Sequence, residues 1–348
     1  MRRGALSHLF FFIFLFFFIS CAGRPRPRND HFDGRRYHNL ERTSHRGPVA
    51  VLKWFFNRDQ KPWPDKILAS HGPKPPATMT PGRLRVTFVG HSTVLVQADG
   101  VNVLFDPVWS HRVSPVSFAG PARVIPPGLR FGDLPPIHVV AVSHDHYDHM
   151  DYPTLLRLKK HHDPVFVVPL GCKKRLNSQG IRRVVELDWW QRTTIRGLPV
   201  VVVPARHSSG RTLADRDTTL WAGFVLLTQG ARPGVPRRPV LFAGDTGHGR
   251  HFRLIRARFG PMRLALLPIG AYIPRWFMRE VHMDPADAVQ AHLDLGSARS
   301  IAIHHGTFPL ADEARTDPPA DLAAALRHRA LPPGVFTPLE EGFGLEVP

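Results

Sequence analysis

The sequence contains very little cysteine. Cys21 and Cys172 are the only two among 348 residues, which excludes the framework of several disulfides that holds many small secreted domains together. Stability must therefore come from a hydrophobic core. The roughly 265 residues that follow position 81 are enough to bury such a core in one large domain. No internal repeat is visible in the sequence.

Long apolar runs are also missing. The run Leu9–Ile19 has eleven residues, and a helix of that length is too short to cross the hydrocarbon core of a bilayer, which is about 30 Å thick. Arg2 and Arg3 precede the run. A basic start followed by a short apolar run is typical of a signal peptide, so residues 1–21 are predicted to be one.

The end of this segment resembles a bacterial lipoprotein box. The residues are Phe18-Ile19-Ser20-Cys21, with Phe18 where Leu is usual. The resemblance implies that Cys21 is lipidated and becomes the mature N-terminus. Ala22, rather than Asp, then favours an outer-membrane lipoprotein that faces the periplasm. An ordinary cleaved signal peptide and an uncleaved anchor remain alternatives.

Acidic residues are scarce in comparison with basic ones. Lys and Arg number 46 and Asp and Glu number 28, so the formal net charge is +18. A basic surface favours anionic partners such as phospholipid headgroups, lipopolysaccharide or nucleic acid. No nucleic-acid-binding module is visible, so a phospholipid surface is the favoured partner. A general bias of the composition toward Arg, Ala, Pro and Gly is the alternative explanation of the charge.

Differences in composition divide the rest of the chain into an N-terminal segment and one large domain. Residues 22–48 are rich in Arg, Pro, Asn, His and Gly and are predicted to be a flexible tether. Residues 49–70 carry Trp, Phe and Leu, and form either a membrane-facing segment or, as we favour, a strip that packs on the domain surface. A Pro-rich linker, 73–81, leads into the domain. The predicted boundaries are thus 1–21, 22–81 and 82–348.

Regular elements are expected throughout residues 82–348. Asp99-Gly100 between two apolar runs predicts a hairpin. Helices are predicted over 152–161, 172–179, 250–259 and 319–329, and a further one is expected to begin after an N-cap at Asp284. A single short strand is predicted from Val335 onward. Residues 107–136, rich in Gly and Pro, are predicted to be a long ordered loop that forms one wall of a substrate cleft.

The main chemical feature is the stretch His144-Asp145-His146-Tyr147-Asp148-His149. It follows the apolar run 137–142, which predicts a short buried strand. Because side chains alternate along a strand, these groups can converge on one point only if the strand ends and turns. Imidazole nitrogens and carboxylate oxygens are ligands that zinc prefers. The alternative is a His-rich surface loop, since the sequence has 21 histidines.

Three further candidate ligands follow apolar runs. The runs 200–203, 240–243 and 301–303 lead to His207, Asp245 and His304. Ligands of open α/β sheets collect at the carboxyl ends of strands. The sequence therefore predicts that these side chains meet those of residues 144–149.

This order of ligands, H-x-H-x-D-H followed by His, Asp and His, resembles that of the metallo-β-lactamase superfamily over roughly residues 82 to 345. Further motifs are similar to the branch that contains the N-acyl-phosphatidylethanolamine-hydrolysing phospholipase D, among them Gly90-His91-Ser92-Thr93, Glu186-Leu187-Asp188-Trp189-Trp190 and Pro274-Arg275-Trp276-Phe277-Met278. The resemblance implies an α/β fold, a four-layer αβ/βα sandwich of two mixed β-sheets with outer helices. It also implies a zinc enzyme that cleaves a membrane phosphodiester.

The resemblance implies a site for two zinc ions. Its first ion would be held by His144, His146 and His207. Its second ion would be held by Asp148, His149 and His304, and Asp245 would bridge both ions. Iron or manganese is also compatible with such ligands.

Two carboxylates are candidates for catalysis as well as ligation. Asp148 is either a metal ligand or a proton carrier to the leaving group, and Asp245 would act as the bridge. His146 stands where related diiron proteins that reduce oxygen carry Glu, which argues against a redox centre. Cys172 occupies no ligand position, which argues against a site that uses a thiolate.

Four more residues are considered near the site. His91 is expected to lie close to the metals. Asp106 either orients a ligand histidine by a hydrogen bond or caps the turn before Pro107. His282 is a candidate for proton transfer or phosphate contact. His305 should point away from the metals, because side chains alternate along the strand before it.

The leading hypothesis is a dinuclear zinc-dependent hydrolase. Two metals that share a hydroxide would attack the phosphodiester of an N-acylated phospholipid or a similar amphiphile. One alternative is a lactonase, thioesterase or β-lactamase-like enzyme that attacks a carbonyl with the same metals. A second alternative is a metal-binding envelope protein without turnover, against which the complete ligand set argues. Trp189 and Trp190 either line an acyl pocket or pack in the core.

Overall fold

The computed structural model describes residues 30–44, 48–212, 214–230 and 238–348. The predicted signal peptide and Cys21 lie outside the described residues, as do residues 22–29 of the predicted tether. Among the helices described, none combines the length and the apolar composition needed to cross a membrane.

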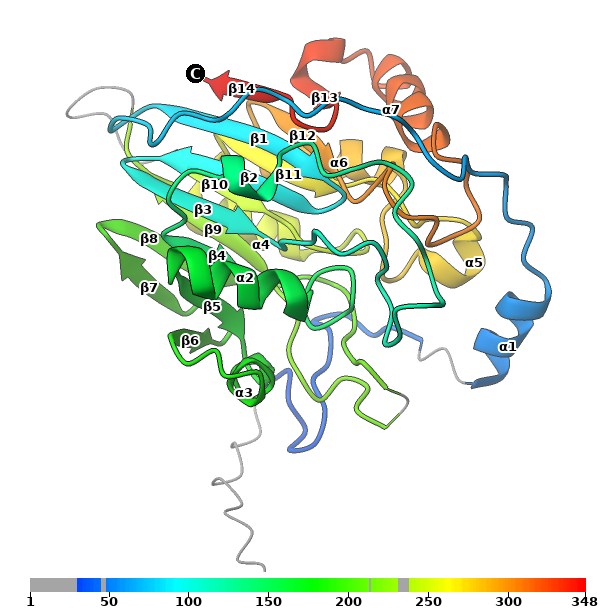
Figure 1. The fold of residues 1–348 in the computed structure, drawn as a ribbon. Helices are drawn as coiled ribbons and strands as arrows, with labels where there is room; N and C mark the ends of the chain where they lie inside the picture. The colour runs from blue at the N-terminus through cyan, green and yellow to red at the C-terminus, as the bar shows by residue number, and fades with distance from the viewer. Residues whose placement is uncertain (1–29, 45–47, 213, 231–237) are drawn as a thin grey trace, which may run out of the picture.

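Two β-sheets form the centre of the described structure (Figure 1). The first has the strand order β14-β1-β2-β3-β4-β5-β6. Its strands are β1 (Leu84–Gly90), β2 (Thr93–Ala98), β3 (Val101–Phe105), β4 (Val139–Ala141), β5 (Val165–Pro169), β6 (Val184–Leu187) and β14 (Gly344–Val347). Strands β3 to β6 are parallel, whereas β14, β1, β2 and β3 pair antiparallel.

The second sheet has the order β13-β12-β11-β10-β9-β8-β7 and repeats this division. Strands β10 to β13 are parallel, and β7 to β10 pair antiparallel. The bounds are β7 (Arg192–Ile195), β8 (Leu198–Val203), β9 (Gly223–Thr228), β10 (Arg238–Phe242), β11 (Leu264–Pro268), β12 (Ser300–Ile303) and β13 (Phe336–Pro338). Both sheets are mixed, as predicted.

Helices lie outside the two sheets (Figure 1). They are α1 (Pro48–Phe56), α2 (Tyr152–His162), α3 (Cys172–Ser178), α4 (His251–Phe259), α5 (Arg275–Met278), α6 (Pro285–Leu295) and α7 (Asp317–His328), with short 3-10 turns η1 (Phe131–Asp133) and η2 (Pro333–Val335). One core cluster lies between the two sheets, a second joins the first sheet to α2 and α3, and a third joins the second sheet to α4, α6 and α7. This is the four-layer αβ/βα sandwich that the sequence predicts.

Local sequence explains several element ends. In the β2–β3 hairpin, Asp99 and Gly100 both have positive φ angles of 52° and 75°, as a two-residue turn of this kind requires. Helix α6 begins where the Asp284 carboxylate accepts a hydrogen bond from the Asp287 N–H, and it ends at Gly296 with φ 56°. The predicted N-cap is confirmed.

The C-terminal prediction is wrong in one respect. From Val335 onward the chain forms two strands, not one: β13 joins the second sheet beside β12, and β14 joins the first sheet beside β1. Glu340 to Gly342 make the turn between them, since Phe343 N–H donates to Glu340 O. The C-terminal segment therefore links the two sheets.

The described N-terminal residues lie on the domain surface. Residues 30–44 pack against it through Tyr37, which is 1% exposed, although their composition predicted a flexible tether. Trp54 of α1 stacks on Phe277, and the Trp63 indole donates to Glu313 O. Residues 49–70 thus pack along the domain on one side. Val49 and Leu52 of α1 remain exposed.

Candidate metal centre

Within each sheet, the strands that lead to the candidate site residues run in the same direction. In the first sheet these are β1, β3 and β4, and in the second they are β8, β10 and β12. Their carboxyl ends meet at one edge of the sandwich. The side chains that follow these ends are His91, Asp106, His144, His207, Asp245 and His304.

The backbone at these strand ends is strained. His91, Asp106 and His304 have φ angles of 56°, 38° and 58°, in the left-handed region where a residue other than glycine is disfavoured by about 1–3 kcal/mol. Gly244, with φ 63°, precedes Asp245, and a Cβ on it would lie 2.8 Å from the Cβ of Ser143. These turns aim the side chains at one point instead of letting them alternate.

Three imidazoles form a first donor cluster. The Nε2 atom of His144 lies 2.8 Å from Nδ1 of His146, and Nε2 of His207 lies 3.3 Å from the same Nδ1. Zinc–nitrogen bonds of about 2.0–2.1 Å place neighbouring nitrogens of a tetrahedral site about 3.3 Å apart. The three nitrogens therefore suit three corners of one such site.

A second cluster contains one carboxylate and two imidazoles. Oδ2 of Asp148 lies 3.3 Å from Nε2 of His149 and 3.4 Å from Nε2 of His304. These distances again match the spacing of ligands around one small cation.

Asp245 lies between the two clusters. Its Oδ2 atom is 3.0 Å from Nε2 of His304, 3.2 Å from Nε2 of His149 and 3.8 Å from Nε2 of His207. One oxygen is thus close to nitrogens of both clusters, which is the position that a bridging ligand needs.

Several of these buried atoms have no hydrogen-bond partner among the described residues. They include Nε2 of His149, Nε2 of His304 and Oδ1 of Asp245. A buried polar atom without a hydrogen bond costs about 1–3 kcal/mol, and the contacts of the two nitrogens with carboxylates are ion pairs without hydrogen-bond geometry. Three such atoms around Asp245 therefore indicate that something else binds there. Donor type, spacing and unpaired atoms all fit two metal ions.

The charge state of the centre also suits cations. Burial opposes ionisation of Asp148 and Asp245, but the neighbouring imidazoles, His149 foremost, together outweigh it and hold the pKa of both carboxyls well below their usual range. Burial is the main reason why the pKa values of His144 and His207 are also lowered. The carboxylates are therefore ionised and these two imidazoles are neutral, as ligands must be.

The pKa values of His149 and His304 are raised instead of lowered. Burial lowers their pKa values, but the surrounding carboxylates outweigh it, and the pKa of His304 rises to about 9. In the metal-free centre these two imidazoles therefore hold protons. A metal ion that binds here would displace them.

Neighbouring groups orient the imidazoles. Nδ1 of His149 lies 2.6 Å from Oδ2 of Asp106, and Nδ1 of His207 donates to the carbonyl oxygen of Val281 at 2.9 Å. Asp106 also accepts hydrogen bonds from the N–H and hydroxyl of Ser143. Of the two roles considered for Asp106, the hydrogen bond to a candidate ligand is the one present.

The remaining candidates are close by. Nε2 of His91 lies 3.0 Å from Oδ2 of Asp148, and Nδ1 of His282 lies 3.9 Å from Oδ2 of Asp245. Burial, foremost, lowers the pKa of His91 to about 3 and that of His282 to about 4. His305 stacks on Phe88 instead of facing the centre, and Cys172 is buried on α3.

Residues 107–136 border two cavities. One cavity of about 390 Å³ is lined by Ser110, His111 and Pro115 of this loop and by Tyr147, which lies within the H-x-H-x-D-H stretch. A second, of about 650 Å³, lies between the loop and residues 65–70. Trp189 packs in the core between the sheets, and Trp190 lies partly buried against it.

Sequence reasoning missed one residue that holds a candidate ligand. The side chain of Asn39 makes two hydrogen bonds to the backbone of His207, at 2.8 Å and 3.0 Å. Asn39 lies in a polar segment with no apolar period, so no local signal marks it.

Comparison with known proteins identifies the family. The sequence profile of the β-lactamase superfamily domain matches residues 101–305. The chain belongs to the metallo-β-lactamase superfamily. It has the fold of this superfamily's metal-dependent hydrolases, and its candidate ligands lie at the sheet edge described above.

Three relatives show how far the similarity extends. An uncharacterised protein of Mycobacterium tuberculosis is 42% identical over 75% of this chain and 72% of its own length. The N-acyl-phosphatidylethanolamine-hydrolyzing phospholipase D 1 of Caenorhabditis elegans is 40% identical over 65% of each chain, so somewhat under two thirds of that enzyme is matched. The outer membrane protein RomA of Klebsiella pneumoniae is 39% identical over 31% of this chain and 75% of its own length.

A solved structure agrees on the fold. Igni18, a metallo hydrolase from the archaeon Ignicoccus hospitalis, superposes with a TM-score of 0.56 at 21% identity and covers 76% of this chain and 99% of its own. At this identity the likeness concerns the fold alone.

Proposed function

We propose that this metallo-β-lactamase superfamily hydrolase is a dinuclear zinc phosphodiesterase of phospholipase D type that acts on an N-acylated phospholipid or a similar amphiphile. The observation that carries the proposal is the position of Asp245, whose Oδ2 lies within 3.8 Å of nitrogens from both clusters. The 40% identity to the C. elegans phospholipase supports the choice of substrate.

The proposed ligands are those of the two clusters. His144, His146 and His207 would hold one ion, and Asp148, His149 and His304 the other. Zinc ions held there would lower the pKa of water and stabilise negative charge on a phosphoryl centre.

His282 would transfer a proton at the leaving group. Its Nδ1 has no hydrogen-bond partner among the described residues, and its side chain is 13% exposed while lying 3.9 Å from Asp245. An imidazole at the edge of the centre can hold or move a proton at the departing oxygen. His91, hydrogen-bonded to Asp148, would keep that carboxylate turned toward His149 and His304.

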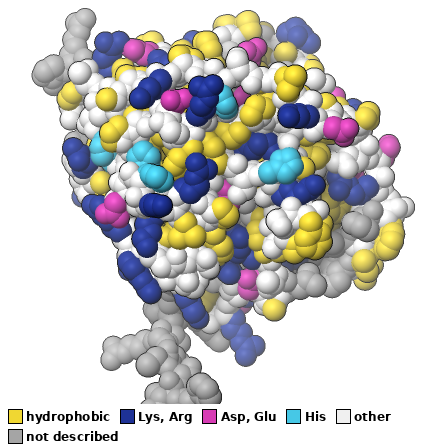
Figure 2. All heavy atoms as spheres, in the orientation of Figure 1, with side chains coloured by type: hydrophobic (Ala, Val, Ile, Leu, Met, Phe, Trp, Pro, Cys, Tyr) yellow, Lys and Arg dark blue, Asp and Glu magenta, His cyan; other side chains and the backbone are white. Residues whose placement is uncertain are grey.

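The molecular surface suits an amphiphilic substrate. On the face shown in Figure 2, Lys and Arg side chains are spread widely and exceed the Asp and Glu side chains, and hydrophobic side chains lie among them. Val49 and Leu52 of α1 are 79% and 54% exposed, and Lys53 lies beside them over the Trp276 ring. Apolar and basic groups together favour an anionic phospholipid surface as the partner of α1.

We also propose that residues 1–21 export the chain and that lipidated Cys21 anchors it in the bacterial envelope. The name of the RomA relative supports an envelope location. Membrane fractionation of cells that express wild type or Cys21→Ser tests the anchor. The wild-type chain should sediment with outer membranes and the variant should not, whereas equal sedimentation would contradict lipid anchoring.

The catalytic proposal is tested by metal content and lipid hydrolysis in one experiment. The full chain, purified in detergent, is compared with Asp245→Asn for bound metal by elemental analysis and for cleavage of N-acyl-phosphatidylethanolamine. About two zinc ions in wild type and a loss of at least a hundredfold in turnover for the variant are expected. Asp163→Asn is the matched control, since Asp163 is exposed at the end of α2.

The outcomes separate the alternatives. Two bound metals without lipid cleavage, but with turnover of a lactone, thioester or β-lactam, would mean that the same site hydrolyses a carbonyl substrate. Two metals without turnover of any of these would favour a metal-binding envelope protein. A wild-type chain that takes up no metal would contradict the ligand assignment.

A further inference from the structure

Residues 30–44 form a segment that we call the strap. It is held on the domain along its length. Near its start, the His31 imidazole lies 2.7 Å from the Asp188 carboxylate and stacks on Trp189 at a centroid distance of 4.4 Å. Near its end, the Ser44 N–H and hydroxyl both donate to Glu280. The strap is therefore fixed at its start to the loop after β6 and at its end to the segment after α5.

Asn39 lies midway along the strap and pairs with the peptide of His207. Its Nδ2 donates to the carbonyl oxygen of His207 at 2.8 Å, and its Oδ1 accepts from the His207 N–H at 3.0 Å. Oδ1 also accepts from the Trp221 indole at 2.8 Å. Because a donor faces the carbonyl and an acceptor faces two N–H groups, the amide orientation is well defined.

His207 needs such a partner. Strand β8 ends at Val203, four residues earlier, so the His207 peptide has no strand neighbour to complete its hydrogen bonds. Buried backbone polar groups are nearly always paired, and His207 is 2% exposed. The Asn39 side chain takes the place of the missing strand.

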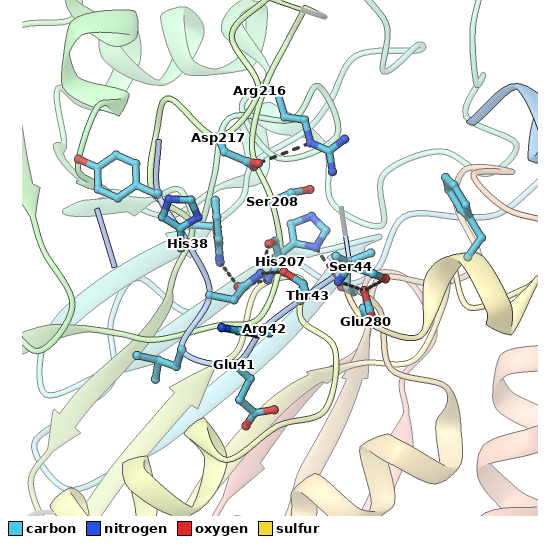
Figure 3. Close-up of a pocket in the computed structure, with 16 residues that line it drawn as sticks. His38, Glu41, Arg42, Thr43, Ser44, His207, Ser208, Arg216, Asp217 and Glu280 are labelled. Atoms are coloured by element: carbon cyan, nitrogen blue, oxygen red, sulfur yellow. Dashed lines mark hydrogen bonds and ion pairs between the residues drawn. The ribbon is translucent and has the colours of Figure 1, made fainter. Parts of the chain in front are cut away.

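Two residues hold different parts of His207. Asn39 fixes the backbone, and the Val281 carbonyl accepts from Nδ1 at 2.9 Å and fixes the ring. As a result Nε2 points at the first cluster, 3.3 Å from Nδ1 of His146. Figure 3 shows His207 among the strap residues Thr43, Ser44 and Arg42, around a cavity of about 540 Å³.

We propose that Asn39 is a positioning residue for His207, and that the strap is a working part of the metal centre because it carries Asn39. The inference rests on the proposed metal-dependent function and extends it to a segment outside the sandwich. It predicts that the cluster of His144, His146 and His207 loses metal affinity when Asn39 is truncated, while the cluster of Asp148, His149 and His304 is spared.

The test is a cobalt titration of the full chain in detergent, after removal of bound metal. Cobalt(II) reports each site by its visible absorption. His146→Ala and His304→Ala assign the bands to the first and second clusters. For Asn39→Ala we expect a 10–100-fold weaker affinity in the band assigned by His146→Ala, the usual effect of removing a group that orients a metal ligand. The other band should change by less than about threefold.

Two further variants serve as a control and as a conservative substitution. Asn57→Ala is the matched control, since Asn57 lies just after α1 and its exposed side chain donates to Lys53 O of the same helix. Asn39→Asp keeps the oxygen that accepts from His207 and Trp221 but places a second carboxylate oxygen against the His207 carbonyl oxygen, so an equally selective loss of affinity is expected. If Asn39→Ala does not fold, the cobalt affinities of Asn39→Asp show whether the loss is confined to the cluster of His144, His146 and His207.

Unchanged cobalt affinity in a folded Asn39→Ala chain would overturn the inference. Equal weakening of both bands would do the same, because it would mean that Asn39 supports the fold in general. If wild type binds no metal at all, it is the proposed function that fails, and this result is distinct from two intact bands in the Asn39 variants.

Discussion

Asp106 and His149 are joined by a contact of 2.6 Å between Oδ2 and Nδ1, and neither side chain is exposed to solvent. Asp106 closes β3 in the left-handed conformation, and its other oxygen accepts the N–H of Ser143. The carboxylate thus ties the end of β3 to the end of β4. It also turns Nε2 of His149 toward Asp148 and Asp245.

We expect Asp106→Asn to weaken metal binding at the cluster that contains His149 by 10–100-fold, because a neutral amide cannot hold the imidazole as a carboxylate does. Cobalt or zinc titration with a competing chelator measures the change. The same substitution at the exposed Asp163 should leave both affinities unaltered. Metal binding by Asp106→Asn equal to that of wild type would mean that His149 is positioned by other contacts.

The meeting of the candidate ligands at one sheet edge could be predicted from the sequence because each follows an apolar run. His207, Asp245 and His304 come after β8, β10 and β12, and the direction of these strands brings them to one edge. Local pattern was sufficient here, since a buried strand is marked by its own residues and its end is marked by the polar residue after it.

Features that depend on distant partners were not predictable. Asn39 contacts a residue 168 positions away, and nothing in its polar neighbourhood distinguishes it from a tether. The segment after Val335 splits between two sheets because β1 and β12 provide separate edges. Strand β7, Arg192–Ile195, was missed because its polar residues alternate in exposure and form no apolar run.

Removal of metal should destabilise the protein strongly. Each ion present at a hundred times its dissociation constant adds about 2.7 kcal/mol, so the loss of two should lower Tm on the order of 10 °C. Thermal unfolding before and after chelation measures this. Zinc should restore the original Tm, whereas magnesium, which prefers oxygen ligands, should not. An identical Tm for metal-loaded and metal-free protein would contradict a metal centre built from these buried residues.

Gly270 is required for the close approach of two backbones. A Cβ on this residue would lie 2.1 Å from the carbonyl oxygen of His304. Gly270→Ala should therefore destabilise the fold by about 1–3 kcal/mol and displace His304, which weakens metal binding. Denaturant unfolding and metal titration measure the two effects. Gly132→Ala, where a Cβ meets nothing within 4 Å, is the control, and equal stability of both variants would be the contrary result.

His251 makes stability depend on pH. It is 4% exposed, and burial foremost, with help from the charges of His248 and Arg206, lowers its pKa to about 3. The unfolded chain, with a pKa near 6.5, then binds a proton that the folded chain rejects. Stability from this residue is complete well above pH 6.5 and declines below it, by about 1.4 kcal/mol at pH 5.5. Urea unfolding of wild type and His251→Gln should diverge by that amount between pH 7.5 and 5.5, and not between pH 8.5 and 7.5.

The exposed face of α1 should determine how the protein meets a lipid surface. Val49 and Leu52 are exposed, whereas Trp54 of the same helix stacks on Phe277, so changes at the first two leave the packing of α1 intact. In protein lacking residues 1–21, Val49→Asp with Leu52→Asp should weaken binding to anionic phospholipid vesicles by at least tenfold. The reason is that burial of such side chains contributes about 1.5–3 kcal/mol each and the new charges repel the headgroups. Vesicle sedimentation measures the change.

Cleavage of a short-chain, monomeric phosphodiester by this double variant should remain at the wild-type rate, because α1 contributes no residue to the two clusters. Leu254→Asp is the matched control, since Leu254 is 41% exposed on α4, a helix that packs on the second sheet and not beside α1. A double variant that still binds vesicles as wild type does would exclude α1 as the membrane contact. A loss of monomer cleavage equal to the loss of vesicle binding would mean that the substitutions disturb the centre through Trp54 and Phe277 and do not act at the lipid surface.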